Sequence, residues 1–86
     1  MPASVSLYLK NELARANEHA CAARQIVAEQ ELRIARMNAA GHPTFSSERI
    51  LELLAESLKL LEDNERELRS EAAALEKLEV KLSRLI

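Results

Sequence analysis

The polar residues that could do chemistry in this chain lie within two long apolar patterns. Gln30, Ser57, Asn64 and Glu71 fall where a coiled-coil repeat turns side chains inward. Inward polar groups can hold a metal or small ligand in a helical bundle, or they can fix the register of a coiled coil. The di-metal bundles use a Glu followed three residues later by a His, and this sequence has no such pair. We therefore expect register control, with no metal and no cofactor.

The other candidate reactive groups do not form a catalytic pattern. His19 and Cys21 are two residues apart, which on a helix points them about 200° away from each other. A single glycine leaves no phosphate-binding loop, and neither Cys21 nor any serine has a histidine at a spacing that one helix would bring together to act as a base. His42 reads as a turn residue. We predict that the protein is not an enzyme.

Composition indicates a long-helix protein. Of 86 residues, 48% are apolar and 30% charged, with heavy use of Ala, Leu, Glu and Arg, which is typical of coiled coils. So short a chain buries a limited core, and oligomerisation is a common remedy. Tyr8 and Phe45 are the only aromatic residues, and the net charge is −2. Neither base-stacking surfaces nor clustered basic residues are present, so we expect no nucleic-acid partner.

The start of the chain and its one cysteine bear on location. MPASVSLYLK has neither the charged start nor the apolar stretch of a secretory signal, and no apolar run approaches the roughly 20 residues of a membrane span. Cys21 alone cannot close an intrachain disulfide, which favours a reducing compartment. We expect a cytoplasmic protein with no membrane partner.

Turn residues occur together at one place only. Gly41 suits a left-handed helix C-cap, Pro43 cannot continue a helix, and Thr44, Ser46 or Ser47 can cap the next one. The chain is therefore predicted to be a single helical hairpin over residues 1–86. One helix spans about 4–40, the turn spans 41–45, and the second helix spans about 46–85.

Two apolar stripes at alternating three- and four-residue spacing support an antiparallel coiled coil. In a hairpin, residues that face each other have numbers with a nearly constant sum, and this rule pairs apolar residues with a heptad of leucines. The predicted first stripe is Leu9, Leu13, Ala16, Ala20, Ala23, Val27, Gln30, Ile34 and Met37; the second is Ile50, Leu54, Ser57, Leu61, Asn64, Leu68, Glu71, Leu75, Leu78, Leu82 and Leu85. The implied pivot falls in the Gly41–Thr44 turn.

The same pairing predicts polar layers in the seam. It sets Gln30 against Ser57, with Asn64 and Glu71 facing alanines. Buried polar layers of this kind penalise slipped or parallel pairings.

Apolar residues beyond these stripes predict a partner. Leu51, Leu53, Leu58 and Leu60 flank the second stripe, and Ile26 flanks the first. Two helices cannot enclose this many large side chains, and leaving them in one exposed patch invites association. We predict an all-α hairpin that dimerises into a four-helix bundle, with these five residues at the protein interface.

Two functional hypotheses follow. The first is a non-enzymatic protein–protein interaction or scaffold module that acts as a homodimer. The second is a small regulator or chaperone that sequesters a helical or basic protein partner, using the apolar surface and the acidic run at residues 62–67.

Residues 24–69 resemble a group of small alphaproteobacterial helical-hairpin proteins. That group carries an I-A-E-x-E-x-R-I-A-R helix, a G-H-x-T turn and a helix of the L-L-x-x-L-x-x-S-L type. The residues at matching positions are Ile26, Glu29, Glu31, Arg33, Ile34, Ala35 and Arg36, then Gly41, His42 and Thr44, then Leu53, Leu54, Leu58 and Leu60; Val27 interrupts the first motif. The resemblance implies a helical hairpin of uncharacterised function, and it transfers no active-site residues.

Overall fold

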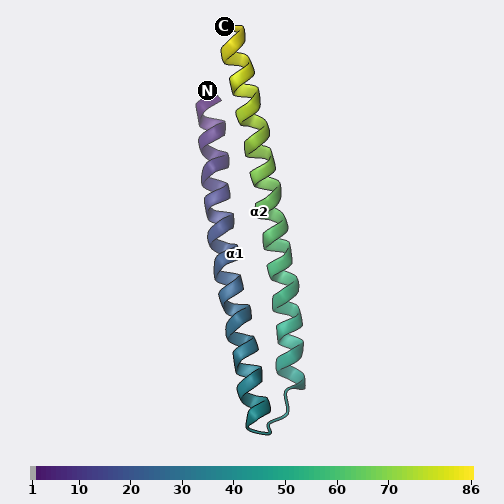
Figure 1. Cartoon of the computed structure of the whole chain (residues 1–86). Helices are drawn as coiled ribbons and strands as arrows, with labels where there is room; N and C mark the ends of the chain where they lie inside the picture. The colour runs from purple at the N-terminus through teal and green to yellow at the C-terminus, as the bar shows by residue number, and fades with distance from the viewer. Residues whose placement is uncertain (1) are drawn as a thin grey trace.

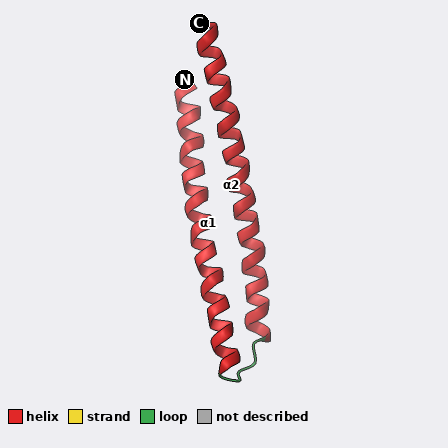
Figure 2. Ribbon diagram, viewed as in Figure 1, coloured by secondary structure: helices red, strands yellow, loops and turns green. Residues whose placement is uncertain are grey.

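The structure is a computed structural model that describes residues 2–86, with side chains from residue 5 onward. Helix α1 comprises Pro2–Ala39 and helix α2 comprises Phe45–Leu85. The two helices lie side by side and antiparallel, joined by one short turn (Figure 1; Figure 2). They form a rod of 70 × 15 × 14 Å. The all-α hairpin predicted from the sequence is confirmed, with helix bounds within two residues of those expected.

The turn forms because Gly41 adopts a left-handed conformation, with φ of 77°. The N–H of His42 donates to the carbonyl of Met37 at 2.9 Å, and the N–H of Gly41 donates to that of Asn38 at 3.1 Å. These are the two hydrogen bonds of a Schellman C-cap. At the start of α2, Thr44 is the N-cap residue, although its side chain makes no capping hydrogen bond. Its carbonyl accepts from the N–H of Glu48 at 2.8 Å.

The seam of α1 follows the predicted stripe. Every residue from Leu9 to Met37 in that stripe is buried or half-buried, and the most enclosed are Ala20, Ala16 and Ile34 at 0%, 4% and 8% exposure. The core is thin because most seam residues of the middle turns are alanines.

The predicted seam of α2 is wrong at seven of its eleven positions. The leucines at 54, 61, 68 and 75 do turn toward α1, but the predicted residues between them are exposed. The buried or half-buried residues of α2 that alternate with those leucines are Ser47, Leu51, Leu58, Glu65, Ala72 and Glu79; the exposed ones are Ile50, Ser57, Asn64, Glu71, Leu78, Leu82 and Leu85.

The error has a simple origin. A heptad of leucines fits two seams, one continuing three residues after each leucine and one continuing four residues after it. The first would bury Ser57, Asn64 and Glu71. The second buries Leu51, Leu58 and Ala72, and Glu65 is the one charged residue among its middle layers. The second seam covers more apolar surface, which the hydrophobic effect favours.

Gly41→Ala tests the turn. A Cβ at residue 41 would meet no atom within 4 Å, so any loss of stability comes from the left-handed backbone conformation alone. We expect the free energy of unfolding to fall by about 1 kcal/mol, measured by chemical denaturation at fixed protein concentration. Gly41→Asn is the control, and its free energy of unfolding should fall by less, because Asn tolerates this conformation. Equal stability of Gly41→Ala and wild type would contradict the role of the cap.

Candidate interaction surface

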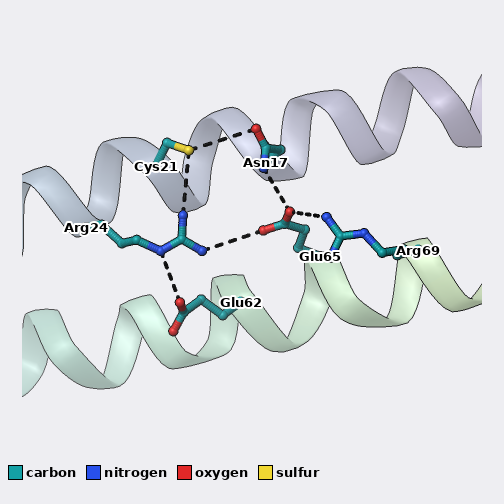
Figure 3. Close-up of polar contacts among 6 residues, drawn as sticks. All are labelled: Asn17, Cys21, Arg24, Glu62, Glu65 and Arg69. Atoms are coloured by element: carbon teal, nitrogen blue, oxygen red, sulfur yellow. Dashed lines mark hydrogen bonds and ion pairs between the residues drawn. The ribbon is translucent and has the colours of Figure 1, made fainter.

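An ionic cluster links the helices near their middle (Figure 3). Glu65 Oε2 accepts hydrogen bonds from Asn17 Nδ2 at 2.9 Å and from Arg69 Nη2 at 2.8 Å. Arg24 Nη2 lies 3.9 Å from Glu65 Oε1, and Arg24 Nε donates to Glu62 Oε2 at 3.1 Å. The side of the hairpin that carries these five residues is called the ionic flank.

Glu65 is a buried seam residue, 5% exposed. The seam residues of α1 on either side of Asn17 are Ala16 and Ala20. Their small side chains leave room for the Glu65 carboxylate. The hydrogen bond from Asn17 lowers the pKa of Glu65 below its usual value, and the hydrogen bond and charge of Arg69 act in the same direction, against the effect of desolvation. The hydrogen bond to Glu62 raises the pKa of Arg24. Glu65 is therefore held ionised in the seam.

Cys21 lies at the edge of this cluster with an exposed, free thiol. Its Sγ lies 3.9 Å from Asn17 Oδ1 and accepts from Arg24 Nη1 at 3.6 Å (Figure 3). Among the described residues, no three His, Cys, Asp or Glu side chains gather closely enough to hold a metal ion.

The predicted polar layers are also corrected. Gln30 is buried, but its Nε2 donates to the carbonyl of Ser47 at 2.9 Å and not to Ser57. The Ser47 hydroxyl donates to Met37 Sδ at 3.4 Å, so both contacts tie the start of α2 to the end of α1. Ser57, Asn64 and Glu71 are exposed and form no seam layer.

The five predicted interface residues fall into two groups. Leu51 and Leu58 are half-buried seam residues, which is a consequence of the corrected register. Ile26, Leu53 and Leu60 are exposed at 48%, 57% and 70%. Only these three of the five positions are exposed, and their place at a protein interface stays a prediction.

The exposed residues share one side of the hairpin. Ile26 is two residues beyond Arg24 and Leu60 is two residues before Glu62, so each is turned about 200° away from the ionic flank. Leu53 lies two turns before Leu60 on the same stripe. Ile50, which the sequence placed in the seam, is 47% exposed beside them. Ile26, Ile50, Leu53 and Leu60 are called the apolar flank.

The acidic run at residues 62–67 is largely occupied within the chain. Glu62 and Glu65 contact Arg24, and Asp63 Oδ1 accepts from Arg66 Nη1 at 3.0 Å. Glu67 alone of its acidic residues has no ion pair with a described side chain. The run therefore offers less free negative charge to a basic partner than its composition suggests.

A shallow groove opens between the helices toward the chain ends, with a volume of about 300 Å³. Its apolar lining consists of Leu9, Leu13, Ala72, Ala73 and Leu75. Charges of both signs surround it, so it favours no single class of ligand.

A scan of family models, a search of curated proteins and a search of solved structures found no match to this chain. Within residues 2–86, neither helix has an apolar stretch of the length that a membrane crossing needs.

Sequence reasoning missed Glu65 and Ile50 because of the register error. A signal for Glu65 was present: Asn17 and Arg24 lie beside the seam of α1, and Arg69 follows Glu65 by one helical turn. A seam carboxylate with these neighbours can be satisfied, whereas Glu71 opposite alanines cannot.

The lowered pKa of Glu65 predicts a pH dependence. A depressed carboxyl pKa contributes stability above the unfolded-state value near 4.5, and this contribution is lost as the pH falls through the folded-state pKa. As the pH falls below about 4.5, the unfolding free energy of wild type should therefore fall more steeply than that of Glu65→Gln. At pH 7 the variant should be the less stable protein.

Thermal unfolding across this pH range at fixed concentration measures the effect. Glu56→Gln is the matched control, because Glu56 is exposed and has no ion pair with a described side chain. Parallel pH curves for wild type and Glu65→Gln would contradict the assigned role of Glu65.

Proposed function

We propose that this protein is a non-enzymatic protein–protein interaction module that works as a homodimer of helical hairpins, joined through the apolar flank into a four-helix bundle. The observation that carries the proposal is the cluster of exposed aliphatic residues on one side of the rod, opposite the ionic flank. A scaffold role fits, because such a bundle is rigid and presents charged outer surfaces.

The exposed area supports association. The described chain exposes 6843 Å², whereas a compact protein of 9.6 kDa exposes about 5,000 Å². A standard interface buries about 800 Å² on each partner. The excess surface of one hairpin is therefore large enough for a stable dimer.

The apolar flank supplies the driving force. Its four side chains are roughly half exposed or more, and burying the exposed part of each is worth roughly 1 kcal/mol. Eight such side chains come together in a dimer, and their combined gain of roughly 8 kcal/mol is of the same order as the entropy cost of joining two molecules.

A cytoplasmic setting fits the same proposal. Cys21 is exposed and unpaired, and a free surface thiol is best preserved in a reducing compartment.

Leu60→Glu tests the interface. A carboxylate at this position would be buried without a partner in the dimer, once in each copy, and should raise the dimer dissociation constant by roughly 100-fold or more. Multi-angle light scattering after size-exclusion chromatography over a dilution series measures the change. Circular dichroism should show that the variant remains helical at concentrations where it associates.

Leu32→Glu is the matched control. Leu32 is 51% exposed and lies six residues beyond Ile26, which turns it about 120° away from the apolar flank around α1. Its dissociation constant should equal that of wild type. Equal weakening by both substitutions would contradict the assignment of the apolar flank, and a monomeric wild type with a stable heteromeric partner would favour the sequestering regulator instead.

A further inference from the structure

We infer that a second copy covers this side of the rod along its whole length, with a second apolar contact formed by Val5, Tyr8 and Leu78 at the end opposite the turn. These three residues are called the open-end patch. Their role rests on the proposed self-association through the apolar flank, and it extends that interface by about 30 Å along the rod.

The open-end patch lies on the same side of the rod as the apolar flank. Residues seven apart share one stripe of a coiled coil. Val5 is three such repeats before Ile26 on α1, and Leu78 is four repeats after Ile50 on α2. Tyr8 is five full helical turns before Ile26. Each helix therefore carries residues of both apolar groups on one side.

The three residues form one patch across the two helices. Asn17 contacts Glu65 across the seam. Val5 precedes Asn17 by twelve residues, and Leu78 follows Glu65 by thirteen, so Val5 and Leu78 lie at nearly the same level. This level is near the end of the rod that holds both termini (Figure 1). Val5, Tyr8 and Leu78 are 53%, 62% and 56% exposed.

The apolar flank supplies only part of a stable interface. A fully exposed aliphatic side chain carries roughly 100 Å² of apolar surface, so its four half-exposed side chains present about 200 Å² on one copy. A standard interface buries about 800 Å² on each partner, a little over half of it apolar. The open-end patch adds about as much apolar surface as the flank, which brings the total close to that of a standard interface.

Polar residues accompany the two apolar groups on the same stripes. On α1 these are Glu12, His19 and Arg33, and on α2 they are Ser57, Asn64 and Glu71. Long charged side chains can reach water from the edge of a contact, and protein interfaces commonly hold bridging water. The inferred contact therefore has an apolar cluster toward each end of the rod, with hydrated polar residues beside and between the clusters.

The length of the dimer distinguishes full overlap from contact at the apolar flank alone. On α2 the flank is centred about ten residues, or about 15 Å, from the start of the helix. Two rods joined only there, with their open ends pointing in opposite directions, would span about 110 Å. Overlap along the whole side keeps the length close to the 70 Å of one hairpin. Small-angle X-ray scattering of the unmodified chain measures this dimension.

Leu78→Glu tests the open-end patch itself. A carboxylate at this position would be buried without a partner in each copy and should raise the dimer dissociation constant by about tenfold or more. Val80→Glu is the matched control, because Val80 is 47% exposed and lies two residues beyond Leu78, which turns it about 200° away. The dissociation constant of the control should equal that of wild type. Sedimentation equilibrium over a dilution series measures both, and circular dichroism checks that the variants remain helical.

The possible outcomes separate this inference from the proposed function. Weakening by Leu78→Glu but not by Val80→Glu, in a dimer close to 70 Å long, would support the full-length contact. Weakening by Leu60→Glu but not by Leu78→Glu, equal weakening by Leu78→Glu and Val80→Glu, or a length near 110 Å would overturn it and leave the proposed self-association standing. A monomeric wild type would overturn both.

Discussion

Two packed helices can cover only one stripe of each other, and this limit governs the rest of the structure. The seam of this hairpin encloses alanines in its middle and only half-covers its leucines, so none of the large side chains that the structure describes is fully buried. The chain nevertheless carries branched apolar residues outside the seam. A partner of the same shape is the simplest way to cover them, because the hydrophobic effect acts on every exposed patch of this size.

The two sides of the seam have opposite chemistry. On one side, Arg24, Glu62, Glu65 and Arg69 satisfy one another's charges and fix the level of α2 against α1. On the other side, Ile26 and three residues of α2 remain exposed. A hairpin with one satisfied side and one apolar side has a defined inner face in a bundle. The ionic flank would then be the outer face.

The fold could be predicted from the sequence because its signals are local. Gly41 and Pro43 stop the first helix, and alternating apolar residues mark the seam of α1 correctly. The seam of α2 could not be chosen in this way, because the leucines at 54, 61, 68 and 75 belong to two competing patterns. The choice depends on contacts between the helices: the second seam covers more apolar surface, and Asn17 and two arginines satisfy the Glu65 that it buries. Because of the same error, Ile50 was predicted in the seam and is exposed, whereas Leu51 and Leu58 were predicted at the surface and lie in the seam.

The central claim is that one hairpin is an incomplete unit. Sedimentation equilibrium of the unmodified chain tests this claim most directly, because it reports mass without a label or a substitution. Our account predicts a mass of twice the 9.6 kDa of one chain at micromolar concentrations, with dissociation only on strong dilution. A mass of 9.6 kDa at every concentration would contradict it.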